Sequence, residues 1–255
     1  MKDVLVVVYG VFGRGFKHTH SNQVECVCAP LTAAGLTYDI HFVNNNIEDV
    51  TIDGVNVNNE DYKLSHYDFY TELKQREIND IIKDVLGEYG VNDIFHGGHY
   101  VRDITHNAFL NSYIESAAGG VLLENKDNYK YTVAFCSDLF LEKPIDVSWF
   151  DPEDVVLSNY HCAGGYTNGF YMGSCLNVSK LLSSFDLLGK IEPVYDYEGL
   201  IKSVAIKHSL SIKLVSEVRF LKIRATGIPG GAFFGESTPL YKQYKATKKV
   251  DPSIY

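Results

Sequence analysis

The stretch Tyr129-Lys-Tyr-Thr-Val-Ala-Phe-Cys-Ser-Asp-Leu-Phe-Leu-Glu-Lys-Pro-Ile145 decides the fold. Its first part, Tyr131 to Cys136, is almost continuously apolar and rich in aromatic and β-branched residues. That composition predicts a strand buried on both faces, as in the middle of a parallel or mixed sheet. The apolar run stops at Ser137-Asp138, and ligands of open α/β sheets bind just beyond the carboxyl ends of strands. Asp138 is therefore either a turn residue or the anchor of a site.

The beginning of the chain predicts the same class of fold. Val4 to Val8 form an all-apolar run that ends at Tyr9-Gly10, which predicts a buried first strand. Residues His20 to Ala34 can form a helix that Pro30 interrupts, and residues 38–43 then predict a second strand, which is followed by asparagines. A β-α-β beginning of this kind is typical of α/β sheets that bind nucleotides.

Periodicity predicts the remaining elements. Asp53-Gly54 is a tight-turn signal that predicts a small hairpin between Val50 and Val57. Apolar residues on one helical face predict a helix from Asp68 to Leu86 and another from Ile104 to Leu123. Further expected elements are strands at Asp154 to Leu157, Leu210 to Val215 and Val218 to Ile223, a loop with a short strand from Asn159 to Gly173, and helices at Leu176 to Leu188 and Tyr195 to His208.

Length and composition suit one domain. The chain has 255 residues, of which 45% are apolar, so it can bury a sizeable core. We expect a single α/β domain over residues 1–227, with a mixed central sheet flanked by helices, and a C-terminal arm over residues 228–255 with few periodic signals. The formal net charge of −9 argues against a nucleic-acid partner, because such binding depends on clustered cations that meet phosphates.

The cysteines and the absence of long apolar runs predict the compartment. The five cysteines show no paired framework, and their odd number suggests free thiols in a reducing compartment. No stretch approaches the length of about 18 apolar residues that a membrane-spanning helix needs. The run from Val4 to Val8 is too short for the core of a signal peptide. We therefore expect a cytoplasmic protein without a transmembrane segment.

The residues after the first strand, Tyr9-Gly-Val-Phe-Gly-Arg-Gly-Phe16, predict a glycine-bearing loop. Such a loop either is a plain tight turn or brings backbone N–H groups close to a phosphate, and Arg14 adds a permanent charge with a forked donor pattern. Glycines at positions 10, 13 and 15 do not match G-x-G-x-x-G, and the Gly-Lys-Ser/Thr ending of a Walker loop is absent. A Rossmann dehydrogenase or a P-loop kinase is therefore disfavoured.

Two histidine pairs are candidate metal ligands, and two acids at the start of a predicted helix are candidate catalytic residues. His96-Gly-Gly-His99 and His18-Thr-His20 lack a matching set of ligands at a recognised zinc spacing, so we interpret them as solvated histidines. Asp196 and Glu198 open a predicted helix, where acids are favourable by the helix dipole alone, or one of them is the general base for an acceptor hydroxyl. Arg224 follows the last predicted strand and either faces a phosphate or lies on the surface.

The order of these features resembles a known group of proteins. The opening strand is followed by Gly-x-x-Gly-Arg, and a later helix carries Arg102 and Asn107. After these come Ser-Asp-Leu-Phe-Leu-x-x-Pro-Ile, a Thr-Asn-Gly-Phe-x-x-Gly-Ser loop and a final Phe-x-Lys-Ile-Arg. Together these motifs resemble small glycosyltransferase-like proteins found in bacteria and large DNA viruses, and the resemblance runs in order through residues 4–225.

The resemblance implies a GT-A-like fold that binds a nucleotide-diphosphate sugar, with a UDP-sugar as the favoured donor. In that fold an Asp-x-Asp after a central strand holds Mn²⁺ or Mg²⁺ on the diphosphate, and its last aspartate corresponds to Asp138. The first acidic position is Cys136 in this chain. A single carboxylate leaves open a metal-independent enzyme that neutralises the diphosphate with Arg14, Arg102 or Arg224, or a chain without catalytic activity.

The expected function is the transfer of a sugar from the nucleotide diphosphate to a hydroxyl of a glycan or glycoprotein acceptor, in the cytoplasm or, for a viral chain, the host cytoplasm. The implied site residues are Tyr9, Gly10, Arg14 and Asn44 for the nucleotide, Arg102, Asn107 and Arg224 for the phosphates or the donor sugar, Asp138 for the metal, and Asp196 or Glu198 for the acceptor. The rival interpretation is a non-catalytic carbohydrate- or nucleotide-binding domain on the same fold. A methyltransferase is disfavoured, because the second strand ends in asparagines rather than in an acidic ribose ligand.

Overall fold

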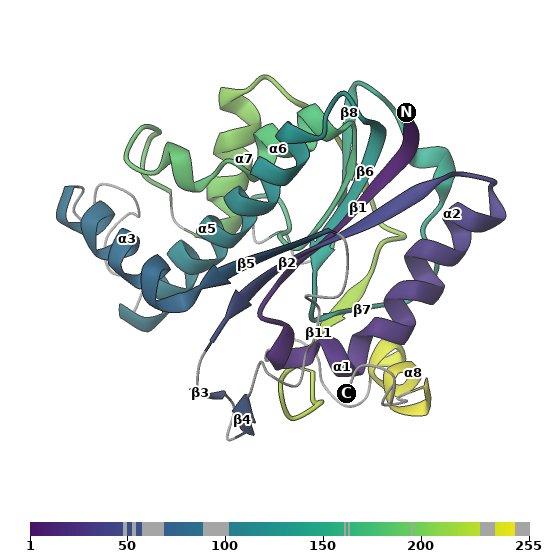
Figure 1. The fold of residues 1–255 in the computed structure, drawn as a ribbon, viewed down its shortest axis with the longest axis horizontal. Coiled ribbons are helices and arrows are strands. Elements are labelled where there is room, and N and C mark those ends of the chain that lie inside the picture. The colour runs from purple at the N-terminus through teal and green to yellow at the C-terminus, as the bar shows by residue number, and fades with distance from the viewer. Residues whose placement is uncertain are drawn as a thin grey trace.

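A mixed sheet forms the centre of the protein (Figure 1). The computed structural model describes residues 1–47, 50–52, 55–57, 69–88, 102–160, 162, 164–194, 196–229 and 238–247. The strands of the central sheet are β1 (Lys2–Gly10), β2 (Tyr38–Asn46), β5 (Tyr70–Lys74), β6 (Tyr129–Cys136), β8 (Asp154–Ser158), β9 (Phe170–Gly173) and β10 (Ser211–Val215). Within these residues the sheet has seven strands in the order β10-β8-β9-β6-β1-β2-β5. The predicted α/β class with a mixed sheet is confirmed.

The strands that follow β1 in the chain are added first on one side of it and later on the other. From β1 the chain continues to β2 and then β5 on one side, and it returns to pair β6 on the other side of β1. These pairings are all parallel, whereas β9 runs antiparallel to both of its neighbours, β6 and β8. The carboxyl ends of β1 and β6 therefore lie side by side at a topological switch point, the usual place for a ligand in an open α/β sheet.

Helices cover both faces of the sheet (Figure 1). The helices on one face are α3 (Gln75–Glu88), α5 (Arg102–Glu124), α6 (Cys175–Leu182) and α7 (Tyr197–Lys207), and those on the other are α1 (Phe12–Gln23), a π-helical turn (Val24–Cys28) and α2 (Ala29–Ala33). Alternate residues of β1 join two separate cores, with Leu5 and Val7 facing α5 and Val6 and Val8 facing α1. Both faces of β1 are buried, which explains its unbroken apolar run.

The first helix begins earlier than the sequence suggests. We expected a loop from Tyr9 to Phe16, but α1 begins at Phe12 and includes the glycines at 13 and 15. The side chain of Asn44, from the neighbouring strand β2, accepts a hydrogen bond from the Phe12 N–H at 3.2 Å. A free donor of the helix N-terminus is thus satisfied by a residue distant in sequence, which no local pattern reveals.

Pro30 does not interrupt the helical path, because a π-helical turn precedes it. A proline at this position cannot donate to the carbonyl four residues earlier, which belongs to Cys26. That carbonyl instead accepts a hydrogen bond from the N–H of Ile145 at 2.9 Å. The chain therefore continues from the π-helical turn Val24–Cys28 into α2 without an unsatisfied group at this point.

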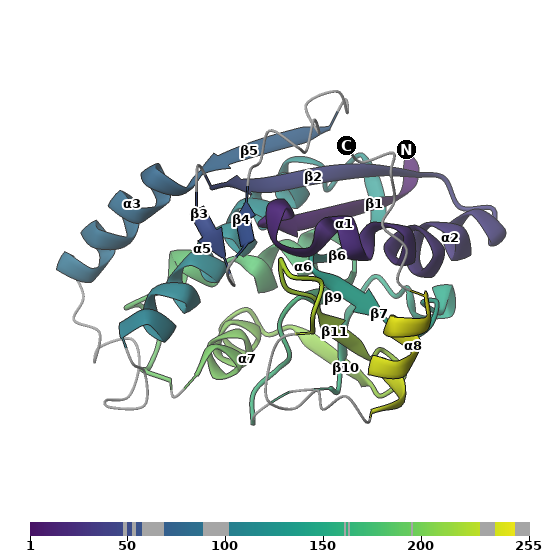
Figure 2. The same cartoon turned by 90° about the horizontal axis from the view of Figure 1, so that it is seen from below.

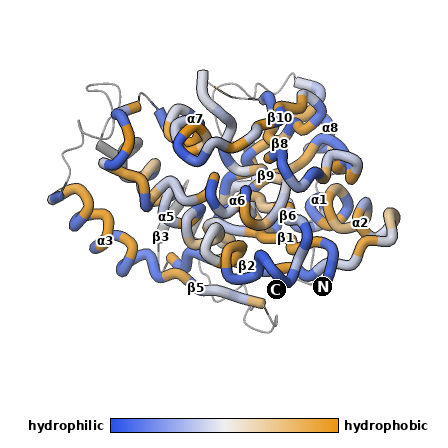
Figure 3. Tube along the Cα trace, turned by 90° about the horizontal axis from the view of Figure 1, so that it is seen from above, coloured by the Kyte–Doolittle hydropathy of each residue, from blue (hydrophilic) through white to orange (hydrophobic). Residues whose placement is uncertain are grey.

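The predicted helix from Asp68 to Leu86 is wrong in its first part. Residues Tyr70–Lys74 form the edge strand β5, which pairs in parallel with β2, and α3 begins only at Gln75. Hydrogen bonding to β2 overrides the helical periodicity there, because backbone pairing depends on a partner strand and not on the local pattern. Beyond Gln75 the amphipathic pattern holds, with Ile78 and Ile82 buried, and α3 alternates between orange and blue segments in Figure 3.

The C-terminal arm also contains more structure than we expected. It includes α8 (Pro239–Thr247), which lies beside a two-stranded ladder of β7 (Leu139–Leu141) and β11 (Phe220–Lys222) (Figure 2). Leu240 and Tyr244 of this helix pack against Phe140 and Leu221. A helix of nine residues is marginal on its own in water, so this tertiary contact stabilises it.

Most of the other expected elements are confirmed. The hairpin near Asp53-Gly54 is formed by β3 (Val50–Ile52) and β4 (Val55–Val57), which pair in antiparallel fashion. The helix expected from Leu176 to Leu188 divides into α6 and a short 3₁₀ turn (Phe185–Leu187), and a further 3₁₀ turn spans Val147–Trp149. His96 to His99 lie outside the described residues. None of the helices in the described ranges combines the length and the apolar character that crossing a membrane requires.

Gly15 provides a test of the close packing between α1 and the end of β11. A Cβ atom on Gly15 would overlap the backbone carbonyl oxygen of Ile223, whereas a Cβ on Gly120 of α5 would meet no atom within 4 Å. We predict that Gly15→Ala lowers the free energy of unfolding by about 1–3 kcal/mol through overpacking. Gly120→Ala, the control, should raise it by about 0.5–1 kcal/mol because alanine favours a helix. Urea unfolding measures both, and a Gly15→Ala protein as stable as the wild type would contradict the packing.

Candidate functional site

A pocket of about 460 Å³ lies beyond the carboxyl ends of β1 and β6. Its walls come from the corner between β1 and α1, from one side of α5, from the turn after β6, from the loop before β9 and from the end of β11. The pocket therefore occupies the switch point of the sheet, where the order of the strands reverses. Six of the residues expected from the sequence to form a site line it: Tyr9, Gly10, Arg14, Asn107, Asp138 and Arg224.

The corner between β1 and α1 fits closely against the turn after β6. The N–H of Ser137 donates a hydrogen bond to the carbonyl of Tyr9 at 2.7 Å. Gly10 has a φ of +133°, and a Cβ atom there would lie 2.9 Å from the Ser137 hydroxyl oxygen. Only glycine accommodates both the backbone angle and the close approach at this position.

Asp138 lies in the turn between β6 and β7 and also lines the pocket. The turn interpretation of this residue is therefore confirmed, and its role as the anchor of a site stays a prediction. Asp138 is 8% exposed, and its backbone carbonyl accepts a hydrogen bond from the N–H of Ile223 at 2.8 Å. The preceding carbonyl, of Ser137, accepts from Thr19 and Gln23 of α1 at 2.6 and 2.9 Å. The backbone on each side of Asp138 is thus fixed by two other elements.

Three cationic side chains line the pocket: those of Arg14, Lys222 and Arg224. The Nε atom of Arg14 is buried and has no hydrogen-bond partner among the described residues. Lys222 donates to the side-chain oxygen of Asn168 at 2.7 Å. In the part of the chain that the structure describes, none of these cations forms an ion pair. The three cations outnumber the two acidic side chains among the described residues that line the same cavity, Asp138 and Glu115, although the net charge of the chain is −9. An excess of positive charge of this kind is favourable for an anion.

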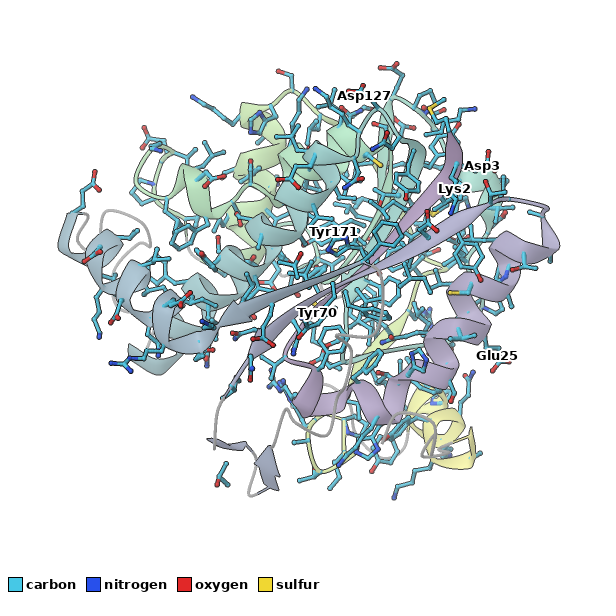
Figure 4. The ribbon with its side chains drawn as sticks, in the orientation of Figure 1. Lys2, Asp3, Glu25, Tyr70, Asp127 and Tyr171 are labelled. Carbon is cyan, nitrogen blue, oxygen red and sulfur yellow. The ribbon has the colours of Figure 1, made fainter. Side chains whose placement is uncertain are left out.

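Glu115 of α5 is a buried carboxylate at the same pocket, and it is only 3% exposed. Its Oε1 accepts hydrogen bonds from the hydroxyls of Tyr9 and Tyr171, each at 3.0 Å, and its Oε2 accepts one from Tyr197 at 2.6 Å. Figure 4 shows Tyr171 near the centre of the molecule. Burial raises the pKa of the Glu115 carboxyl above its ordinary value, while the three tyrosines and the charge of Lys222 act in the opposite direction.

Cys136 ends β6 and also lines the pocket. Burial raises the pKa of its thiol to about 12, so the side chain is neutral at ordinary pH. A Cβ atom on Gly169, which has a φ of +98°, would lie 3.1 Å from the Cys136 sulfur. This position, where the glycosyltransferases that the motifs resemble have an acid, therefore holds a neutral thiol packed against the Gly169 backbone. Among the described residues, no group of three or more His, Cys, Asp or Glu side chains is arranged to hold a metal ion.

Asn44 does not contact the pocket, although we expected it to hold the nucleotide. It is 1% exposed, and its side chain joins the N–H of Phe12 to the hydroxyl of Tyr70. Asn44 therefore fixes the start of α1 and acts on the pocket only by positioning that helix. Arg102 begins α5, and the placement of its side chain lies outside the described structure.

Asp196 and Glu198 are not among the residues that line the pocket. Asp196 caps α7, because its side chain accepts a hydrogen bond from the N–H of Gly199 at 2.6 Å. Burial raises the pKa of the Glu198 carboxyl above its ordinary value. The carbonyl of Glu198 accepts from the N–H of Tyr166 at 3.0 Å, which joins α7 to the loop before β9. The role of either acid as a general base stays a prediction.

Sequence reasoning gave no role to four polar residues of the pocket, although two of them, Asn168 and Lys222, lie within the motifs quoted above; the other two are Asn111 and Glu115. Glu115 and Lys222 share a signal that could have revealed them. Each is a single charged residue inside a segment that otherwise predicts a buried face, Tyr113 to Ala118 for the acid and Phe220 to Ile223 for the cation. A charged residue in such a position is expected to have a partner or a functional role.

No protein-family model matches the chain, and no curated protein matches it. The fold and the pocket are therefore the grounds for a functional proposal. The resemblance to glycosyltransferases rests on the motifs alone.

The buried carboxyl of Glu115 should make stability depend on pH. Its pKa is raised by burial above the ordinary value of 4.5, so the folded protein holds this proton to a higher pH than the unfolded chain. As the pH rises above about 4.5, the folded state loses stability relative to Glu115→Gln, which does not titrate. We predict that the difference in free energy of unfolding moves in favour of the glutamine variant across this interval.

Urea unfolding of both proteins at a series of pH values measures this difference. Glu25→Gln is the matched control, because Glu25 is an exposed acid of the π-helical turn (Figure 4). The control should show no comparable trend. A wild-type protein that gains stability over Glu115→Gln as the pH rises would contradict the effect of burial and favour the tyrosine hydrogen bonds as the larger influence.

Proposed function

We propose that this chain is a glycosyltransferase that binds a nucleotide-diphosphate sugar, with a UDP-sugar as the favoured donor, and transfers the sugar to an acceptor hydroxyl. The observation that carries the proposal is the buried Nε of Arg14, which lines the pocket without a hydrogen-bond partner among the described residues. A buried donor left unsatisfied costs about 1–3 kcal/mol. A ligand that supplies an acceptor would remove this cost.

The chemistry of the cations favours a diphosphate as that ligand. A guanidinium group presents a planar fork of donors that matches phosphate oxygens, and two such groups, Arg14 and Arg224, line the same cavity. Lys222 adds a third positive charge, which is held in place by its hydrogen bond to Asn168. The carboxyl groups of Asp138 and Glu115 line the same pocket and offset part of this charge, and a diphosphate would balance the remainder, which a neutral ligand would not.

The same charges are suited to a transfer reaction. When the bond between sugar and phosphate breaks, negative charge accumulates on the departing nucleoside diphosphate. Fixed cations that are already oriented toward that charge stabilise the transition state without reorganising. Arg14, Lys222 and Arg224 come from two different elements that meet at the turn of Asp138, so their positions are set by the fold.

Asp138 is the residue that would hold Mn²⁺ or Mg²⁺. Mg²⁺ is commonly bound through one or two carboxylates together with phosphate oxygens of the substrate, so one carboxylate fits such a metal only when the nucleotide is present. A bound metal would supply further neutralisation of the diphosphate. The neutral thiol at Cys136 leaves the cations of the pocket to provide most of the compensating charge.

A non-catalytic nucleotide- or carbohydrate-binding domain is the second candidate. The observation in its favour is that neither Asp196 nor Glu198 lines the pocket. Both candidates require the same donor to bind. They differ in turnover, because only the enzyme releases nucleoside diphosphate when it is incubated with a donor.

We predict that UDP-sugars raise the melting temperature of the protein and that Arg14→Ala weakens their binding by about tenfold or more, the value of a charged hydrogen bond. Lys17→Ala is the matched control, because Lys17 is a cation of the same helix that does not line the pocket. Thermal shift and calorimetric titration measure the effect. The proposal is wrong if no UDP-sugar changes the melting temperature with or without Mn²⁺.

A second prediction concerns turnover. Incubation with UDP-sugars and Mn²⁺ should give slow hydrolysis of the donor, and Asp138→Asn should abolish or sharply reduce it. Asp146→Asn serves as the control, because Asp146 caps the 3₁₀ turn Val147–Trp149 and does not line the pocket. Release of UDP is the measurement. Binding of donors without any release of UDP would support the non-catalytic candidate instead.

A further inference from the structure

One side of α5 presents a row of polar side chains to the pocket. Asn107, Asn111 and Glu115 follow one another at intervals of four residues and all line the cavity. Leu110 and Ile114 line it from the same side of the helix. Residues at this spacing share one helical face, so the pocket has a wall of alternating polar and apolar groups. The cations that we assign to the diphosphate come from α1 and from the end of β11.

The carboxylate of Glu115 is held in a fixed position by three elements. The tyrosines that donate to it belong to β1, β9 and α7. The hydroxyl of Tyr171 also accepts from the N–H of Gly169 at 3.4 Å, which limits the rotation of that group. An ionised carboxyl group offers about four acceptor sites. The three tyrosines use three of them, which leaves one acceptor site of a residue that lines the cavity.

We propose that Glu115, with Asn107 and Asn111, binds the sugar ring of the donor by accepting a hydrogen bond from a ring hydroxyl, and that it disfavours sugars that carry a carboxylate. This inference rests on the proposed function, because it assigns the part of the pocket that the diphosphate does not use. A carboxylate can only accept hydrogen bonds, so a hydroxyl group is a suitable partner. The two amides donate and accept, and Leu110 and Ile114 can contact the C–H groups of a ring.

The exclusion of acidic sugars follows from charge. Glu115 is buried, and the repulsion between two like charges is larger in a buried site than in water. A sugar with a carboxylate would have to approach this fixed negative charge. A neutral hexose would not, and it would also supply the missing hydrogen-bond donor.

The test compares matched pairs of nucleotides: UDP-glucose with UDP-glucuronate, and UDP-galactose with UDP-galacturonate. In each pair the sugars differ only by the carboxylate, and UDP alone reports on the diphosphate site. We expect Glu115→Gln to weaken the neutral UDP-sugar by about tenfold and to leave UDP within about twofold of the wild type. The preference for the neutral over the acidic sugar should also shrink. Calorimetric titration measures each dissociation constant.

Ser116→Ala is the matched control for a general disturbance of α5. Ser116 is the neighbouring residue, and its hydroxyl donates to the Leu182 carbonyl and accepts from the Phe185 N–H, away from the pocket. It should leave all dissociation constants unchanged. If Glu115→Gln fails to fold, Asn111→Ala replaces it, because Asn111 is exposed, and it should weaken the UDP-sugar but not UDP.

The outcomes separate the two proposals. If these variants weaken UDP and the UDP-sugars equally, or change neither, the assignment of the sugar to α5 is overturned while the diphosphate site stands. If the wild-type protein binds neither UDP nor any UDP-sugar, the proposed function fails and this inference fails with it.

Discussion

The pocket depends on how closely the ends of β1 and β6 approach each other. Gly10 allows the corner after β1 to pass the Ser137 hydroxyl, and the hydrogen bond from Ser137 to Tyr9 holds the two ends together. The packing of Gly15 against the Ile223 carbonyl then brings α1 to the end of β11. Arg14, Asp138 and the cations at the end of β11 converge on one cavity because of these contacts. Larger residues at either glycine would separate the walls that the proposed anion site requires.

The charge distribution in the pocket is uneven in a way that suits a ligand with two different parts. In our proposal the cations of α1 and of the β11 end form a region that binds the phosphates. Glu115 and the asparagines of α5 are proposed to form a region that binds hydroxyl groups, and three tyrosines hold the Glu115 side chain in place. Lys222 belongs to both regions, because it lines the cavity and its charge lowers the pKa of Glu115. If the proposal is right, the arrangement would also orient the ligand, since exchanging its two ends would place the phosphates against the buried Glu115 and away from the two arginines.

Part of the site could be predicted from the sequence, because strand ends carry local signals. The apolar run before Asp138 identified the strand and the acid at its end, and the glycines after Val8 identified the opposite corner. Glu115 was missed although a single acid inside the apolar face of a helix is a signal for a partner or a function, because that signal does not say which residues the acid faces. Asn44 was assigned to the nucleotide by the resemblance, yet it lies within β2 and its side chain accepts a hydrogen bond from the N–H of Phe12. Sequence position alone does not distinguish these two uses of a polar residue.

The sequence by itself determined the α/β class, the buried strands β1 and β6, the long helix α5 and the acid that follows β6, because hydrophobic periodicity depends only on neighbouring residues. The tertiary structure alone decided where α1 begins, that Tyr70–Lys74 is a strand, and that the arm carries a helix, because each of these depends on a partner distant in the chain. It also decided which polar residues share one cavity. Lys222 and Glu115 are separated by more than a hundred residues in sequence, and only the packing of β11 and α5 around the switch point brings both of them to the pocket.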